Sequence, residues 1–372
     1  MIVPVHGEVP DLLDRLRRVR EAGDVPLVGD ARPGPLSSDR AQWDAVAATA
    51  AQARLADGAA WAALTSGSSG TVRIVLRTAA SWADSFGTVS RLLDAGPDDV
   101  VLLPAPPSAS LTLFSLAHAL EGGPRPLLGS ATRTAAYSSA TCLHGTPQAL
   151  RATLDAGAPP RLRAALIGGS HFDTALRARA EAAGIRVSAY YGAAELSFVA
   201  VDEGDGLRPF PGVELSIREG ELWVRSPFVA LGYAGASGPL RRDGEWATVG
   251  DRAELVDGRL RLLGRADDAI LSASATIVPE EVEAVLRSVP GIRDAIVFGL
   301  PRERVGALVA AFVELDDTHV VDLRGASEER LAVAHRPRRW FAGELPRTAS
   351  GKPARAEAVR RALDGEVPRL VV

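Results

Sequence analysis

The 372-residue sequence predicts an α/β fold, with a large N-terminal domain, a small β-rich subdomain within it and a small C-terminal domain. Short apolar runs alternate with helical segments up to about residue 195, which is typical of layers around a largely parallel sheet. From residue 207 to 265, apolar and polar residues alternate between Gly and Asp-Gly turns, which indicates an antiparallel, barrel-like sheet. After residue 266 the pattern becomes mixed α+β again.

The helices and strands of the N-terminal domain follow from the spacing of apolar residues. Residues 11–22 carry them at helical spacing, whereas residues 24–40 are rich in Gly, Pro, Asp and Ser and are expected to form a loop. A second helix is expected from Ser38, its cap, to Gly58, its stop. Strands are expected in AAWAALTSGSSG, DVVLLPAP, RPLLG, RAALIGG and IRVSAYYG, and helices in FSLAHALEGG, TPQALRATLDAG and DTALRARAEAAG.

The C-terminal domain is expected to span residues 266–372, after an N-terminal domain of residues 1–265. Helices are expected in PEEVEAVLRSV, in SEERLAVAH and at the end of the chain. Strands are expected in DAIVFGL and ALVAAFVEL.

Composition excludes several classes of protein. The net charge of −4 provides no basic field for nucleic acid, and no apolar run reaches the roughly 18 residues of a membrane span. The N-terminus lacks the basic start and apolar run of a signal peptide, so we expect a cytoplasmic protein. The single cysteine, Cys142, excludes an internal disulfide and a multi-cysteine metal site, and we expect it to be buried.

A glycine-serine loop follows the apolar run at residues 61–64. The segment TSGSSGTVR spans residues 65–73 and combines hydroxyl side chains with two glycines. Backbone N–H groups and hydroxyls of such a loop can surround phosphate oxygens, and glycine allows close approach. A flexible linker is the alternative interpretation.

Two further segments join glycine to acidic, basic or aromatic side chains. YYGAAE, residues 190–195, follows an expected strand, where an aromatic ring can stack on a base and Glu195 can bind Mg²⁺. Asp251 follows Gly250, and GRADD spans residues 264–268. An Asp can accept both hydroxyls of a ribose, and an Arg can pair with ribose or phosphate oxygens. Each segment alone is also compatible with ordinary turns.

Lys352, in LPRTASGK, is the only lysine among 42 basic residues. Lysine is a compact point charge on a flexible stem, whereas arginine is a planar fork. A position that needs a point charge between ligand oxygens would require lysine, although an arginine-rich composition also explains a single lysine by chance.

Taken in this order, TSGSSG, YGAAE, GD, GRADD with PEEVE, and LPRTASGK resemble the adenylate-forming (acyl- and aryl-CoA synthetase) superfamily over residues 60–363. The resemblance implies that the C-terminal domain is a mobile lid. It also implies an ATP-dependent carboxylic acid–CoA ligase that works through an acyl-adenylate with release of pyrophosphate. ATP, Mg²⁺, CoA and a small carboxylic acid would be its ligands.

The resemblance assigns roles to residues of this chain. Lys352, Glu195 and Arg265 would be catalytic, Glu195 would bind Mg²⁺, and Asp267 would be the hinge between the domains. Tyr191 would lie against adenine, and Asp251 would bind the ribose. The nucleotide-binding set implied by the resemblance is Thr65, Ser66, Gly67, Ser68, Ser69, Gly70, Arg73, Gly168, Gly169, Tyr191, Gly192, Asp251 and Arg265.

The sequence departs from the family pattern at several positions. Arg73 stands where the family has lysine, Ala194 where it has threonine, Leu271 where it has a basic residue and Ser274 where it has glycine. Arg73 keeps the positive charge, and Ala194 removes one hydrogen bond to phosphate. Leu271 and Ser274 lie in the loop that, in the family, borders the tunnel for the thiol of the thioester step.

The chain is also short before the phosphate loop, which implies an N-terminally shortened fold. This layout resembles short actinobacterial o-succinylbenzoate–CoA ligase-like enzymes. An acid pocket is expected near residues 104–118 and 143–147, with Ser110 and Thr112 able to bind a polar acyl group.

Three functions remain open at this point. The first is the acid–CoA ligase. The second is a stand-alone adenylating enzyme that loads the pantetheine of a carrier protein or another acceptor. The third is a degenerate nucleotide-binding protein, which the substitutions at positions 73, 194 and 274 would explain. The identity of the acid and the oligomeric state, including a homodimer, also stay open.

Overall fold

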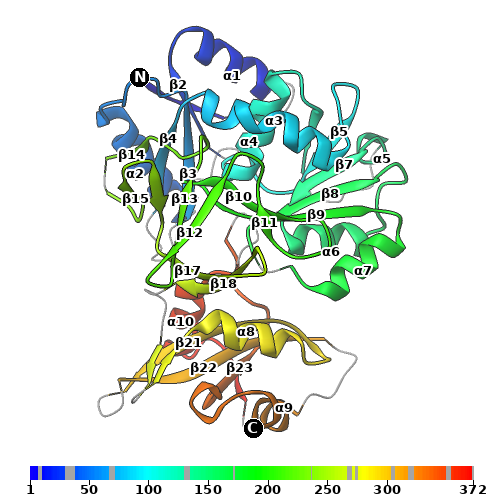
Figure 1. Cartoon of the computed structure of the whole chain (residues 1–372), viewed down its shortest axis with the longest axis vertical. Helices are drawn as coiled ribbons and strands as arrows, with labels where there is room; N and C mark the ends of the chain where they lie inside the picture. The colour runs from blue at the N-terminus through cyan, green and yellow to red at the C-terminus, as the bar shows by residue number, and fades with distance from the viewer. Residues whose placement is uncertain are drawn as a thin grey trace.

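The computed structural model describes most of the chain, and Figure 1 shows its arrangement. A large part built from residues up to about 265 lies above a smaller part that ends at the C-terminus. The described residues are 1–6, 11–29, 38–66, 72–129, 135–170, 172–235, 237–265, 270–272, 275–302, 306–316, 322–348 and 353–370.

The first sheet has five strands in the order β1-β2-β3-β4-β14. The first three are parallel and the last two are antiparallel to their neighbours. The strands are β1 (Ile2–Val5), β2 (Val25–Val28), β3 (Trp61–Ser66), β4 (Val72–Arg77) and β14 (Gly232–Ala234), and the helices between them are α1 (Asp11–Glu21) and α2 (Ser38–Gln52).

Strand β2 corrects the prediction of a loop over residues 24–40. All four of its residues are buried, between β1 and β3. A short strand buried on both faces shows no alternation, so flanking Gly, Asp and Pro dominated the pattern. The helix expected to end at Gly58 ends at Gln52 instead, although Gly58 does adopt a positive φ of 75°.

The second sheet has seven strands in the order β11-β10-β9-β8-β7-β5-β6. Strands β9, β8, β7, β5 and β6 are parallel, and β10 and β11 are antiparallel. The bounds are β5 (Val100–Leu103), β6 (Arg125–Leu128), β7 (Cys142–Gly145), β8 (Ala164–Gly168), β9 (Arg186–Ala193), β10 (Ser197–Asp202) and β11 (Arg208–Pro209). The largely parallel sheet predicted from the alternation is therefore present.

Helices cover both faces of this sheet, so alternate residues of β5 pack into different cores. Val101 and Leu103 pack with the side chains of α3 and α4, whereas Leu102 packs with those of α6 and α7. The strands therefore appear as continuous apolar runs in the sequence. The helices are α3 (Ala80–Leu93), α4 (Ser110–Leu120), α5 (Ala135–Ser138), α6 (Pro147–Asp155) and α7 (Thr174–Ala182).

The third sheet is antiparallel, as the alternation after residue 207 predicts. Its order is β15-β16-β13-β17-β18, with β12 paired to β13. One strand of this region, β14, leaves it and pairs with β4 of the first sheet. The bounds are β12 (Glu214–Arg218), β13 (Glu221–Arg225), β15 (Arg241–Asp243), β16 (Trp246–Thr248), β17 (Asp251–Val256) and β18 (Arg259–Arg265).

The fourth sheet belongs to the C-terminal part and has its own apolar cores. Its order is β20-β19-β22-β23-β24, with β21 paired to β22. The elements are β19 (Ile270–Ser272), β20 (Ala275–Ile277), α8 (Pro279–Arg287), β21 (Ile292–Arg302), β22 (Gly306–Leu315), α9 (Leu323–Arg330), β23 (Arg339–Ala342), α10 (Arg355–Leu363) and β24 (Arg369–Leu370). The boundary at residues 265/266 stays a prediction, since residues 266–269 lie outside the described residues.

The helix expected at SEERLAVAH lies earlier in the chain. Asp322 caps α9 by accepting a hydrogen bond from the Gly325 amide at 2.9 Å, and the helix ends at Arg330. Leu331 is extended, and a short 3₁₀ turn follows at Val333–His335. The apolar spacing therefore predicted the existence of this helix and misplaced its ends, because the helix begins at Leu323, four residues before the expected start.

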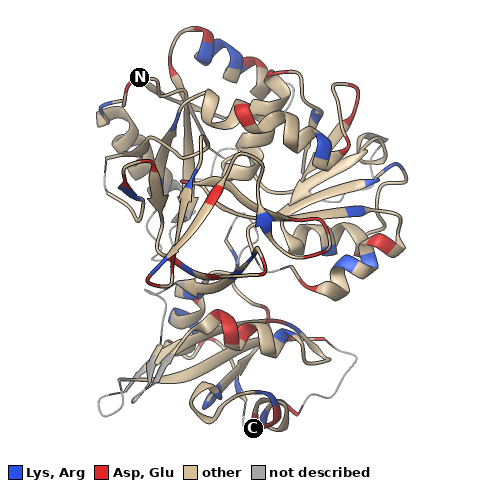
Figure 2. Ribbon diagram, in the orientation of Figure 1, with Lys and Arg blue, Asp and Glu red and all other residues tan. Residues whose placement is uncertain are grey.

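Basic and acidic residues are interspersed over both parts of the molecule (Figure 2). In the described part of the chain, no helix is both long enough and apolar enough to cross a membrane.

Candidate functional site

The phosphate-loop residues begin where β3 ends. Thr65 and Arg73 lie opposite each other in the antiparallel pair β3–β4. Oγ1 of Thr65 is buried and has no hydrogen-bond partner among the described residues. A buried unpaired hydroxyl is rare and indicates a place where a ligand can bind. Of the other predicted loop residues, Ser66 ends β3, and Gly67, Ser68, Ser69 and Gly70 lie outside the described residues.

The hairpin β9–β10 carries the YGAAE segment. Gly192 pairs with Phe198, and a Cβ on this glycine would lie 2.0 Å from the carbonyl oxygen of Ser197. Only glycine therefore fits, which explains the residue type expected there. The tight turn places Glu195 at its tip, where the residue is only 6% exposed. A carboxylate so deeply buried requires partners.

Two of the residues predicted to bind the nucleotide meet although they are 60 positions apart. The hydroxyl of Tyr191 donates a hydrogen bond to Oδ2 of Asp251. Gly250, with φ of 86°, turns the chain just before β17 and so directs Asp251 toward the β9–β10 hairpin. On the neighbouring strand β18, Arg265 is the register partner of Asp251. The backbone therefore brings Tyr191, Asp251 and Arg265 to one place.

Two residues that sequence reasoning missed hold Glu195. The Tyr233 hydroxyl donates to Oε1 of Glu195 at 2.9 Å. Arg77 is fully buried and donates to the carbonyl oxygens of Ala194 and Phe228. Burial lowers the pKa of Arg77 to about 9, and the Glu195 carboxylate opposes that shift. A guanidinium stays buried at such a cost only where its hydrogen bonds fix the structure.

The sequence contains one signal that could have found Arg77. Arg77 is the last residue of the strand VRIVLR, whose last four residues are buried and, apart from Arg77, apolar. A charged residue at a position that the pattern requires to be buried predicts a structural or functional partner. Tyr233 has no such signal, because it lies among Gly, Ala and Leu in a segment without clear periodicity.

The glycine pair of the LIGGS segment lies at the carboxyl end of β8. The Tyr190 ring fills the space in front of Gly168, where a Cβ would lie 2.2 Å from the ring. Gly169 has φ of 92° and so needs the freedom of glycine. Ligands of open α/β sheets bind outside the carboxyl ends of the strands, which is where these residues lie.

A buried polar chain supports Tyr190. Its hydroxyl is 3.1 Å from Nε2 of His144, and Nδ1 of His144 is 2.8 Å from Oγ of Ser115. Burial lowers the pKa of His144 to about 3, so its ring is neutral at physiological pH. Thr112 is also buried and donates to the Ala105 carbonyl at 3.0 Å, so its proton is not available to the acyl group that we expected it to bind.

Several predicted residues cannot be placed. Lys352 and Asp267 lie outside the described residues, and only the backbone of Arg265 is described. Among the side chains that are described, no group of three His, Cys, Asp or Glu could hold a metal ion. A cation at Glu195 would therefore draw its other ligands from a bound molecule and water.

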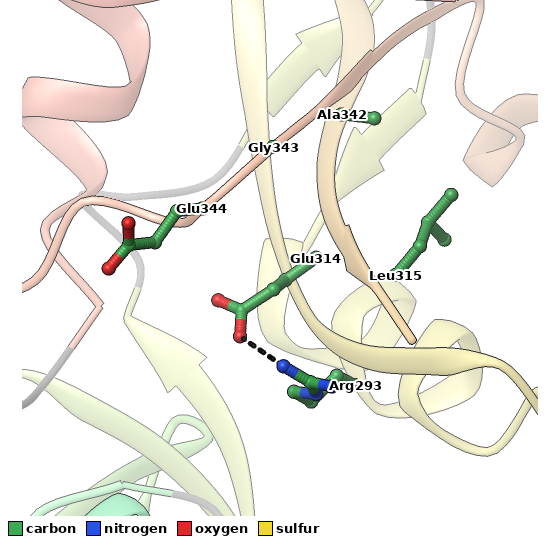
Figure 3. Close-up of a pocket in the computed structure, with 6 residues that line it drawn as sticks. All are labelled: Arg293, Glu314, Leu315, Ala342, Gly343 and Glu344. Carbon is green, nitrogen blue, oxygen red and sulfur yellow. Dashed lines mark ion pairs between the residues drawn. The ribbon is translucent and has the colours of Figure 1, made fainter. Parts of the chain in front are cut away.

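A separate hollow of about 480 Å³ lies on the C-terminal part (Figure 3). Arg293 and Glu314 form an ion pair across it, with 3.8 Å between Nη1 and Oε1. It contains none of the predicted site residues. The lining residues are Arg293, Glu314, Leu315, Ala342, Gly343 and Glu344.

Known proteins are similar to this chain in sequence. An uncharacterised acyl–CoA ligase of Bacillus subtilis, YhfT, is 30% identical over 322 residues, which cover 78% of this chain and 66% of that protein. The 2-succinylbenzoate–CoA ligase of Salmonella typhimurium is 33% identical over 296 residues, covering 75% of this chain and 63% of that protein. The chain thus spans 63% to 66% of the length of these two curated relatives.

The fold is shared with solved structures too. A structure of E. coli MenE with bound OSB-AMS superposes with a TM-score of 0.81 at 23% identity, covering 97% of this chain and 87% of that one. In sequence, residues 5–234 match the AMP-binding enzyme family, and residues 281–352 match the AMP-binding enzyme C-terminal domain. The chain belongs to the AMP-binding enzyme family.

Proposed function

We propose that the chain is an ATP-dependent carboxylic acid–CoA ligase that forms an acyl-adenylate, releases pyrophosphate and then makes a thioester. One observation carries the proposal: the Tyr191 hydroxyl holds Asp251, with Arg265 beside it on the next strand. In this arrangement the carboxylate can accept both hydroxyls of a ribose while the Tyr191 ring lies against the base. The names of the two curated relatives support the CoA ligase activity.

The phosphate end of the proposed site is supported by one buried hydroxyl that has no hydrogen-bond partner in the described part of the chain. The buried Oγ1 of Thr65 can donate to a phosphate oxygen, and Arg73, directly opposite, supplies positive charge. Ala194 offers no hydroxyl, so one hydrogen bond that the family makes to phosphate is absent. We propose that the Arg73 fork replaces part of that contact.

The residues at Glu195 fit a divalent cation. The carboxylate is buried, Oε1 accepts the hydrogen bond of Tyr233, and Oε2 accepts none in the described part of the chain. Mg²⁺ prefers oxygen ligands and is usually held by one or two carboxylates together with substrate phosphates. When bound, Mg²⁺ would neutralise part of the triphosphate charge. Glu195 would supply one ligand of the cation.

In the first reaction a carboxylate oxygen of the acid attacks the α-phosphorus of ATP. The new bond joins carboxylate oxygen to phosphorus, the bond to the bridging oxygen of the β-phosphate breaks, and pyrophosphate leaves. Both reactants are anions, so a cation that contacts both would lower the barrier. We propose that Lys352, carried by the C-terminal domain, is this cation.

In the second reaction the thiol of CoA attacks the carbonyl carbon of the acyl-adenylate and displaces AMP. The proposed lid would rotate about Asp267 between the two reactions. Leu271 and Ser274 stand where the family has a basic residue and glycine, so this reaction is the one that the departures affect. The proposed acid is an aryl or acyl acid, and o-succinylbenzoate-like acids are among the candidates. The proposed compartment is the cytoplasm, where ATP and CoA are available.

The test is exchange of labelled pyrophosphate into ATP across a panel of aromatic, short, medium and long carboxylic acids. We expect exchange with at least one acid class, and a loss of about 100-fold or more in Lys352→Ala. Lys352→Arg keeps the charge and separates charge from shape. Exchange at the parental rate in Lys352→Ala would refute the role of Lys352.

The acceptor is tested separately. Free CoA consumed in step with AMP release supports the CoA ligase. AMP release that requires a carrier protein and leaves CoA unchanged would favour the adenylating enzyme that loads a carrier protein.

A further inference from the structure

The hydroxyl of Tyr233 lies between a donor and an acceptor. It accepts a hydrogen bond from the Leu240 amide at 3.0 Å and is 2.9 Å from Oε1 of Glu195. A phenol has one proton to donate, and a backbone N–H cannot accept it. The proton of Tyr233 must therefore point at Glu195.

The ring of Tyr233 is fixed by what surrounds it. Its backbone pairs with Val75 of β4, inside the sheet that carries the phosphate-loop hairpin. On another side the ring contacts Gly238, where a Cβ would lie 2.2 Å from a ring atom. The hydroxyl is tied to the Leu240 amide of the same loop. The position of the phenol is therefore set by β14 and by residues 237–240, and not by Glu195 itself.

The backbone around Glu195 is held independently of its carboxylate. Arg77 donates to the Ala194 carbonyl, and the Ala230 amide donates to the Glu195 carbonyl at 2.7 Å. These contacts fix the main chain and leave the side-chain torsions of Glu195 undetermined. In the described part of the chain, the Tyr233 proton is the one hydrogen bond that the carboxylate accepts.

We propose that Tyr233 is a positioning residue that holds Oε1 of Glu195 and thereby presents Oε2 to the divalent cation of bound ATP. This rests on the proposed function. The hydrogen bond orients a ligand of the cation and has no direct contact with the nucleotide. Loss of the hydroxyl should therefore weaken binding of metal–ATP and leave binding of metal-free ATP unchanged.

The test compares Tyr233→Phe with the parent and with Tyr137→Phe. Tyr137 serves as the control because it is a buried tyrosine in a core cluster away from the proposed site. Its hydroxyl also donates a hydrogen bond to a backbone carbonyl, that of Gly157, at 3.3 Å. Binding of Mn²⁺–ATP is measured by water proton relaxation, which separates the complex on the protein from the same pair in solution. Binding of ATP in EDTA is measured by calorimetry.

For Tyr233→Phe we expect the dissociation constant of Mn²⁺–ATP to rise about ten-fold, the effect of one lost hydrogen bond to a charged group. The dissociation constant of metal-free ATP should change by less than about two-fold, and Tyr137→Phe should match the parent in both. An unchanged Mn²⁺–ATP constant, or equal weakening with and without metal, would overturn the proposal.

A second variant approaches the same hydrogen bond from the other side. Gly238→Ala keeps the hydroxyl, and its new Cβ pushes the Tyr233 ring away. We expect the same selective loss of Mn²⁺–ATP binding, which keeps the proposal testable if Tyr233→Phe does not fold. A parent that binds no Mn²⁺–ATP would also overturn it. A parent that binds Mn²⁺–ATP but exchanges pyrophosphate with no acid would refute the proposed function and leave this inference standing.

Discussion

Replacing Gly168 by alanine tests the packing at the carboxyl end of β8. The added Cβ would lie 2.2, 2.4 and 2.7 Å from three atoms of the Tyr190 ring, well inside van der Waals contact. Gly168 is not among the residues with positive φ, so its backbone accepts alanine without strain. The effect of the substitution is therefore steric, and it depends on whether the ring can move.

The ring is not free to move. Its hydroxyl is bound to Nε2 of His144 at 3.1 Å, and His144 is bound in turn to Ser115 at 2.8 Å. Overfilling a packed interior costs about 1–3 kcal/mol. Moving the ring breaks a buried hydrogen bond, which adds about 1 kcal/mol. We therefore expect Gly168→Ala to lower the free energy of unfolding by about 2–4 kcal/mol.

The assay is urea unfolding followed by tryptophan fluorescence, in a double-mutant cycle with Tyr190→Ala. Removing the ring should remove the clash, so Gly168→Ala should cost about 2 kcal/mol less in the Tyr190→Ala background than in the parent. Gly87→Ala is the control, because no atom lies within 4 Å of its Cβ position on the exposed side of α3. There alanine should stabilise the protein by about 0.5–1 kcal/mol. A Gly168→Ala variant as stable as the parent, or strictly additive costs, would refute the reasoning.

Three other predictions concern buried charge and protonation. Burial lowers the pKa of His144 from 6.5 to about 3, so the unfolded chain binds a proton at a higher pH than the native protein does. The free energy of unfolding should therefore be at its full value above pH 6.5 and fall by on the order of 4 kcal/mol toward pH 3. His144→Gln should flatten that part of a urea–pH profile. Burial also raises the pKa of Cys142 to about 12, so the native thiol should not react with a disulfide reagent that titrates it fully in urea. Arg355 donates to Oε1 of buried Glu283 at 2.6 Å, so Arg355→Met should destabilise the full chain by about 2–4 kcal/mol in urea, and an unchanged midpoint would contradict that pairing.

The sequence predicted the parallel core because β5, β6, β8 and β9 are short apolar runs that helical segments separate. It missed β2 for the opposite reason, since four buried residues between turn-forming segments show no period. The end of α2 was misplaced because Gly58 offered a stop, while the helix had already ended at Gln52. Patterns of this kind report element type better than element ends.

At the candidate site, the sequence predicted roles for residues of suitable chemical type, such as Glu195 and Asp251. It could not predict that the Tyr191 hydroxyl bonds Asp251, because that contact depends on how the β9–β10 hairpin meets the start of β17. Tyr233 was missed for the same reason, since its partner is 38 positions away and depends on a strand that crosses between sheets.

That crossing strand has a consequence for how the chain is made. Strand β4 of the first sheet has β3 on one side and β14 on the other, and β14 is synthesised about 155 residues later than β4. Until residues 232–234 leave the ribosome, the edge of VRIVLR has no native strand to pair with. An exposed apolar edge of this kind recruits other chains. Nascent or truncated fragments that stop before residue 232 should therefore aggregate or require a chaperone.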